Sequence, residues 1–139
     1  MTATTLITHE RLRQIEEEGW TAEHDDEHVD GSLAKAALCY ATAPHERKMI
    51  TLRSWTPGIE LPGRGDFTCQ ILEDWPWAPE WWKPGGNSPE GRRRDLVKAG
   101  ALLKAEIARL RRLDSSLNDL IDHLYLQLFH VSFRLDVLL

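Results

Sequence analysis

The sequence EGRRRDLVKAGALLKAEIARLRRL, from Glu90 to Leu113, decides the fold because it carries the clearest helical pattern in the chain. Ser88 is placed to cap this helix, with Pro89 at its first position. The apolar residues recur at intervals of three and four and form one stripe: Leu96, Ala99, Gly100, Leu103, Ile107 and Leu110. The sequence therefore predicts a long amphipathic helix around which other elements pack.

This helix is basic near its start, where Arg92, Arg93, Arg94 and Lys98 are found. One interpretation is a solvated face, with pairs such as Asp95 and Lys98. The other is that these four cations meet an anion, either substrate phosphates or an acidic cluster in residues 16–27. We keep Arg92, Arg93, Arg94 and Lys98 as candidate phosphate-binding residues.

Residues 117–139 form another apolar helical pattern, interrupted by charged residues and therefore not expected to span a membrane. One face carries leucine, isoleucine and valine at three- and four-residue spacing: Leu120, Ile121, Leu124, Leu128, Val131, Leu135 and Leu138. Tyr125, Phe129 and Phe133 follow a neighbouring face. A helix that is apolar over so much of its circumference needs two partners. We expect residues 114–139 to dock on a helical core of residues 1–113 and on a second subunit.

The N-terminal part predicts two further helices. The first runs from Thr8 to Glu18 and ends at Gly19, which adopts positive φ without steric cost. Thr21 is placed to cap the second, which continues to Ala41 unless Gly31 divides it into two shorter helices. Together with the two C-terminal patterns, this gives an all-α fold of about four main helices.

Acidic and histidine side chains are concentrated between Glu16 and His28. His24 and His28 are four residues apart, so both rings project from one helix face. A solvated acidic helix start explains the stretch without a ligand. A zinc helix would use the two histidines, but Asp25 stands where the general-base glutamate of His-Glu-x-x-His belongs. A site for Mg²⁺ or Mn²⁺ is the third interpretation, with these candidate ligands: Glu18, Glu23, His24, Asp25 and His28.

Residues 43–89 interrupt the helical patterns and form an irregular insertion between the second and third main helices. Residues 49–52 are compatible with a short strand in a small hairpin, and residues 55–58 and 61–65 carry turn signals. Four of the six tryptophans lie in the proline-rich run of residues 75–84. They predict either a lid folded over the core or a partner-binding surface: Trp75, Trp77, Trp81 and Trp82.

Composition excludes some classes of function. The chain has 139 residues, of which 42% are hydrophobic and 28% charged, as expected of one globular domain. A net charge of −5 argues against direct nucleic-acid binding. Cys39 and Cys69 show neither metal-site nor redox-motif spacing, which fits a cytoplasmic protein. No basic segment precedes an apolar run near the N-terminus, so we expect no secretory signal.

Several of these segments together resemble a family of small uncharacterised phage and prophage proteins. The resemblance rests on ERLRQ at residues 10–14, EGWT at 18–21, EHDD at 23–26, the tryptophan run at 75–84 and RDLVKAGALL at 94–103. It covers most of residues 8–112 and implies a protein that acts in the cytoplasm of a bacterial host cell.

The order of acidic and basic helices is also similar, more loosely, to the MazG-like nucleotide pyrophosphohydrolases. That resemblance implies an all-α oligomer in which magnesium is held by carboxylates on two helices. The chain departs from the pattern, because Glu18 is followed by Gly19 and because Asp95 and Glu106 are three turns apart.

Two functions follow as expectations. The first is metal-dependent hydrolysis of a nucleoside triphosphate, in which the acidic residues hold the metal and the basic residues neutralise developing charge. The alternative is a non-enzymatic phage-type inhibitor, such as an anti-CRISPR or other anti-defence protein. It would bind a host protein through acidic and aromatic surfaces.

Overall fold

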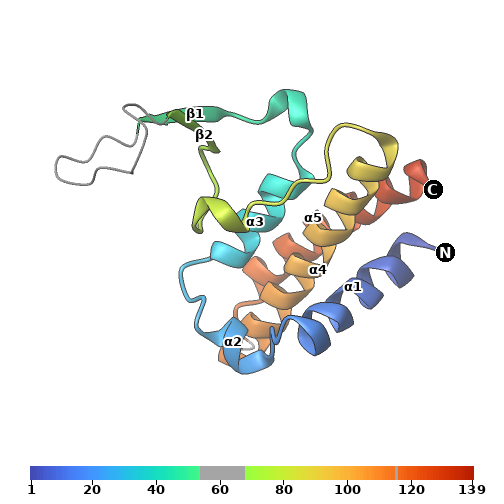
Figure 1. Cartoon of the computed structure of the whole chain (residues 1–139). Helices are drawn as coiled ribbons and strands as arrows, with labels where there is room; N and C mark the ends of the chain where they lie inside the picture. The colour runs from blue at the N-terminus through green and yellow to red at the C-terminus, as the bar shows by residue number, and fades with distance from the viewer. Residues whose placement is uncertain (54–67, 115) are drawn as a thin grey trace.

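The computed structural model describes residues 1–53, 68–114 and 116–139 (Figure 1). The chain is all-α, with a small hairpin in the insertion. The elements in chain order are α1 (Ala3–Glu17), α2 (Ala22–Asp26), α3 (Ser32–Ala41), the 3-10 helix η1 (Pro44–Glu46), β1 (Met49–Arg53), β2 (Thr68–Leu72), the 3-10 helix η2 (Pro79–Trp81), α4 (Pro89–Leu113) and α5 (Asn118–Leu138). The four long helices confirm the predicted fold class.

Helix α4 is the centre of the bundle and packs against α1, α3 and α5 (Figure 1). Ser88 caps it by accepting a hydrogen bond from the Gly91 amide, and Pro89 occupies its first turn, as predicted. Burial extends beyond the predicted stripe: Ala101, Leu102 and Ala105 are also almost inaccessible. The reason is that three helices surround α4, so nearly its whole circumference contacts protein.

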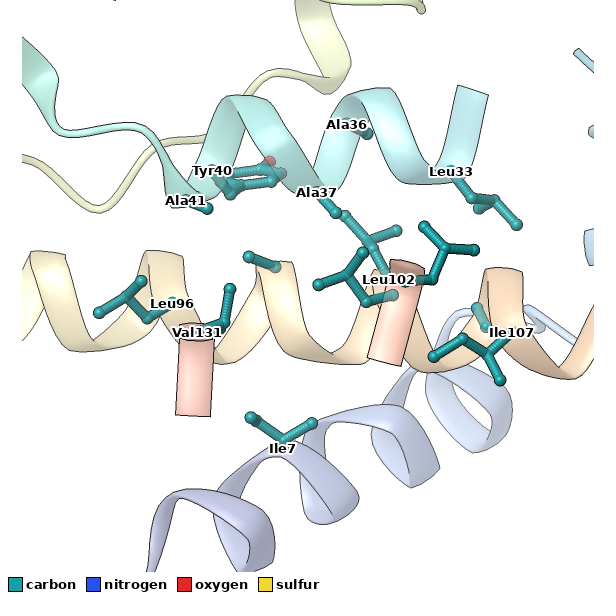
Figure 2. Packing of buried hydrophobic residues seen from close by; sticks show 14 of the residues in the cluster. Ile7, Leu33, Ala36, Ala37, Tyr40, Ala41, Leu96, Leu102, Ile107 and Val131 are labelled. Carbon is teal, nitrogen blue, oxygen red and sulfur yellow. The ribbon is translucent and has the colours of Figure 1, made fainter. Parts of the chain in front are cut away.

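Small residues allow these helices to approach closely. Ala36 and Ala37 of α3 are fully buried against α4, and Ile7 of α1 points toward it (Figure 2). A Cβ atom on Gly100 would lie only 2.5 Å from Cδ1 of Ile7. The lack of a side chain at Gly100 therefore sets the separation of α1 and α4.

The N-terminal helices differ from the prediction at their starts. Helix α1 begins at Ala3 with Thr2 as its cap, rather than at Thr8, whose hydroxyl donates to the Thr4 carbonyl within the helix. It ends as predicted, with Gly19 at φ 72°. Thr21 caps α2, and Gly31 at φ 76° separates α2 from α3. The shorter-helix alternative at Gly31 is the correct one.

The insertion contains an antiparallel hairpin that projects from the bundle (Figure 1). Its backbone pairing runs from Met49 opposite Leu72 to Arg53 opposite Thr68. The turn signals predicted at residues 55–58 and 61–65 lie outside the described residues. The chain then returns to the bundle at Trp75, and residues 75–88 lead into α4.

Helix α5 packs on α4 and α1 through Ile121, Leu124, Val131 and Leu135. Asp136 accepts a hydrogen bond from the Ala3 amide at 2.9 Å, which joins the two ends of the described chain. Leu120 and Leu138, which belong to the same predicted leucine-rich face, are exposed. In the described part of the chain, we find no helix long and apolar enough to cross a membrane.

Candidate functional site: an aromatic pocket with a basic mouth

A cavity of about 640 Å³ lies between the N-terminal helices and the tryptophan run. Leu33 and Leu102 form part of its apolar lining. The largest group of lining residues carries aromatic or histidine rings: Trp20, His24, His28, Tyr40, Trp75, Trp77 and Trp81. Its polar lining residues are Glu10, Arg13, Gln14, Glu18, Lys83 and Lys98. The cavity is thus an aromatic pocket with charged groups grouped on the α1 and α4 side.

The tryptophan run is held on the core by ring contacts. Tyr40 of α3 meets Trp75 edge-on at 5.6 Å and Trp82 at 4.7 Å between ring centroids. Trp75 in turn contacts Trp77 at 5.3 Å. Trp75, Trp77 and Trp82 are half-buried against the core cluster, whereas Trp81 is 58% exposed. Three of the four indoles therefore pack as the lid interpretation requires, and Trp81 is the one that offers a large free surface.

Asp95 anchors the end of this run. It is fully buried, and its carboxylate accepts hydrogen bonds from the Gly85 amide at 2.7 Å and from Arg47 at 3.0 Å. The Arg47 guanidinium lies 4.9 Å from the centre of the Trp82 ring. Asp95 thus joins α4 to both ends of the insertion, and it does not line the pocket.

The two histidines do not share a helix face, contrary to the prediction, because α2 ends at Asp26 and His28 follows it. Their rings are nevertheless adjacent and form part of a row of rings. Trp20 stacks on His24 at 5.7 Å, His24 meets His28 at 5.0 Å, and His28 contacts Trp77 at 5.3 Å. Nδ1 of His28 is 3.2 Å from the Ser32 hydroxyl. This row forms one continuous wall of the pocket.

The predicted metal ligands do not converge. Asp25 is fully buried and accepts a hydrogen bond from Arg11, Glu18 pairs with Arg13 at 3.3 Å, and Glu23 is exposed. Throughout the described ranges, no group of three or more His, Cys, Asp or Glu side chains is placed to hold a metal ion. These donors do not fit Mg²⁺ or Mn²⁺ in this arrangement.

The predicted phosphate-binding residues separate into two groups. Lys98 and Arg94 line a second cavity of about 320 Å³ together with Glu10, Arg13 and Val97. Arg92 is instead half-buried beside Asp95 at 3.7 Å, and Arg93 donates to the Leu138 carbonyl at 3.3 Å. Of the four, Arg94 and Lys98 line these two cavities.

The expected contact between the acidic stretch and the basic helix is made by another arginine. Arg112, at the C-terminal end of α4, donates to Asp26 of α2 at 2.8 Å. Residues 92–94 lie about five turns away along the same helix, since α4 runs from Pro89 to Leu113. The acidic cluster is therefore not the partner of Arg92, Arg93 and Arg94.

Lys98 belongs to both cavities. Its Nζ donates to the Lys83 carbonyl at 2.8 Å and lies 5.2 Å from the centre of the Tyr40 ring. Burial lowers the pKa of Lys98 below its ordinary value of 10.5, opposed by the nearby carboxylates of Asp95 and Glu10. A partly desolvated ammonium of this kind gains strongly from an anionic ligand.

Sequence reasoning missed several lining residues, including Tyr40, Glu10, Arg13 and Gln14. Gln14 carried a signal: it lies seven residues after Ile7, on the buried face of α1, where a polar side chain is unexpected. The arginine and glutamate showed no such pattern, because charged residues at these positions look like an ordinary helix surface.

Comparison with known proteins returns no relative: no family model, no curated protein and no solved structure matches the chain.

Proposed function

We propose that the protein binds a nucleotide. The base lies against the aromatic wall of the larger cavity, and the phosphates lie in the smaller cavity, which is lined by Arg13, Arg94 and Lys98. The observation that carries this proposal is that the aromatic cavity and the smaller basic cavity share Glu10, Arg13 and Lys98. A ligand that is flat and uncharged at one end and anionic at the other matches this pair of cavities.

The aromatic part suits a base. Pockets for small ligands typically measure about 300–1,000 Å³, and the larger cavity, at about 640 Å³, lies within that range. Stacking of a base on an aromatic side chain contributes about 1–3 kcal/mol. Trp81, with more than half of its surface exposed, leaves a ring face free for such contact.

The basic part suits phosphates. Four cations line the two cavities, Arg13, Lys83, Arg94 and Lys98, against the two carboxylates of Glu10 and Glu18. Both carboxylates already pair with Arg13. Arg94 has no ion-pair partner within the part of the chain that the structure describes. Lys83 and Lys98 form no ion pair among the described residues either, so these two lysines and Arg94 are the cations available to an incoming anion.

Hydrolysis of the bound nucleotide is what the MazG-like resemblance implies, and it remains a separate prediction. Asp95 is engaged by Arg47 and the Gly85 amide, and Glu106 is buried in an ion pair with Arg109. Neither carboxylate lines the cavities. The proposal therefore concerns binding, and the same experiment tests cleavage.

The test is a titration with ATP, GTP, CTP and UTP, with and without Mg²⁺ or Mn²⁺, followed by tryptophan fluorescence and by pyrophosphate release. We expect quenching, because the base stacks on indoles. Lys98→Met should weaken binding about tenfold or more, since it removes a charged hydrogen-bond donor. Lys35→Met, an exposed position on α3 away from both cavities, is the control. Absence of quenching by every nucleotide at millimolar concentration would refute the proposal.

A pH dependence follows from Lys98. Because burial lowers its pKa, the free protein loses this charge at a lower pH than an exposed lysine would. A bound phosphate favours the charged form, so nucleotide affinity should fall as pH rises through the lowered pKa of Lys98. The measurement is the dissociation constant from pH 7 upward, and Lys98→Arg, which stays charged, should flatten the curve. An equal slope in the wild type and this variant would contradict the assignment.

One observation favours the alternative function, a phage-type inhibitor of a host protein. The carboxylates from the end of α1 to the start of α3 are largely exposed: Glu16, Glu17, Glu18, Glu23, Asp26, Glu27 and Asp30. One of them, Glu18, lines the aromatic pocket together with the exposed Trp81. Failure of the nucleotide titration would leave this as the better-supported function.

We also propose that a second copy of the chain covers the outer face of α5. That face is an unbroken stripe of exposed large side chains at three- and four-residue spacing: Leu126, Phe129, Phe133 and Val137, with Tyr125 beside it. The same stripe on two copies is self-complementary, which is the requirement for a two-fold dimer.

A further inference from the structure

Two buried polar atoms in the aromatic pocket have no hydrogen-bond partner among the described residues: Oε1 of Gln14 and Nε1 of Trp77. Gln14 is only 3% exposed, and both side chains line the cavity. The Gln14 amide nitrogen donates to Glu10 at 3.4 Å, which leaves its oxygen as the free acceptor. The side chains that line the pocket thus carry one unused acceptor and one unused donor. Both atoms are covered in the free protein, so a ligand reaches them by a small rotation of these side chains.

Such groups are uncommon in folded proteins, because a buried polar atom without a partner loses its hydration and gains nothing in return. A ligand that supplies the missing partners recovers this loss. A ligand of the same shape without these hydrogen-bonding groups does not recover the loss. Polar groups in a pocket therefore discriminate between ligands of similar shape.

We infer that Gln14 and Trp77 read the edge of the bound base: Trp77 donates to a ring or carbonyl acceptor, and Gln14 accepts from an N–H donor of the same ring system. This inference rests on the proposed nucleotide binding and specifies how the base is recognised. The aromatic wall contributes stacking that any base can use. The two polar atoms require a base that presents both a donor and an acceptor.

The neighbouring tryptophans provide a matched pair of variants. Trp77→Phe removes the unused donor, whereas Trp75→Phe removes an N–H that already donates to the Ala78 carbonyl at 3.1 Å. We expect Trp77→Phe to weaken binding of the preferred nucleotide about tenfold and Trp75→Phe much less. In the free protein both variants lose ring contacts, but only Trp75→Phe also loses a hydrogen bond. Trp75→Phe should therefore lower the melting temperature more than Trp77→Phe.

Gln14 is tested from the ligand side. The wild type should bind the preferred nucleotide about tenfold more tightly than an analogue that lacks the corresponding donor; for ATP the analogue is purine riboside triphosphate, which has no amino group. Gln14→Met, similar in shape and without the acceptor, should bind the two ligands equally. The wild-type comparison needs no variant and so holds even if Gln14→Met folds poorly.

The outcomes separate the two proposals. If no nucleotide binds the wild type, the proposed function fails and the inference fails with it. If a nucleotide binds but the wild type does not discriminate between it and its analogue, and Trp77→Phe binds as Trp75→Phe does, the recognition inference is overturned while nucleotide binding stands. If free Trp77→Phe melted at a lower temperature than free Trp75→Phe, that result would likewise contradict an unused donor at Trp77.

Discussion

Replacement of Asp95 by alanine should lower the free energy of unfolding by about 3–5 kcal/mol, the usual cost of removing one partner of a buried ion pair. Asp95 is fully buried, and the side chain of its partner Arg47 is only 7% exposed. The substitution leaves the Arg47 charge without its carboxylate and the Gly85 amide without its acceptor. Chemical denaturation with the wild type as reference measures the loss.

A local effect should accompany the loss of stability. Asp95 fixes the backbone at Gly85, just after the tryptophan run, and fixes Arg47 against Trp82. Without it, Trp75 and Trp82 should become more accessible, which shifts their fluorescence to longer wavelength and increases quenching by iodide. This change should be visible below the unfolding transition.

Two further variants test whether the loss of stability comes from breaking the buried ion pair between Asp95 and Arg47. Asp122→Ala removes an exposed carboxylate on α5 and should change stability by no more than about 0.5 kcal/mol. The double variant Asp95→Leu with Arg47→Met should regain part of the lost stability, because the Arg47 charge is no longer buried without a partner. The recovery should be partial, because Arg92, 3.7 Å from Asp95, still loses its carboxylate. If Asp95→Ala were no more destabilising than Asp122→Ala, Asp95 could not be the anchor of the tryptophan run.

The sequence predicted the helices well where one physical signal dominates. The caps at Ser88 and Thr21 and the end of α1 at Gly19 follow from local hydrogen bonding and positive φ. The start of α1 was less predictable, because Thr2 and Thr8 are equally good caps and the choice depends on Ala3 meeting Asp136 from the far end of the chain. Contacts between distant segments decide such cases.

The sequence predicted several residues of the candidate site but not the contacts between them. The tryptophan run and the histidine spacing pointed to residues that do line the pocket, and Lys98 was among the predicted cations. The pairing of these groups was not visible in sequence. Whether Asp25 faces a metal or Arg11, and whether Arg92 faces a phosphate or Asp95, depends on the rotation of packed helices. A helical pattern shows on which face of its own helix a residue lies. It does not show which side chains of the neighbouring helix that residue contacts.

Charged substitutions on the outer face of α5 should abolish the proposed dimer. Phe129 is 65% exposed and Phe133 is 62% exposed, and Leu126 and Val137 extend the same stripe. A phenylalanine offers roughly 150–250 Å², so these side chains amount to several hundred Å² on each copy. Stable interfaces bury about 600 Å² or more on each partner. The stripe therefore supplies the apolar centre that such an interface needs.

We expect the wild type to have the mass of a dimer in light scattering at micromolar concentration, and Phe129→Glu with Phe133→Glu to have the mass of a monomer. The two glutamates add charge at the centre of the contact, where desolvation without a partner is costly. Leu38→Glu, at an exposed position on α3, is the matched control and should remain dimeric. Circular dichroism should show equal helix content in all three proteins, because none of the substituted side chains belongs to the buried core. A monomeric wild type would show that the apolar face of α5 does not bind a second copy.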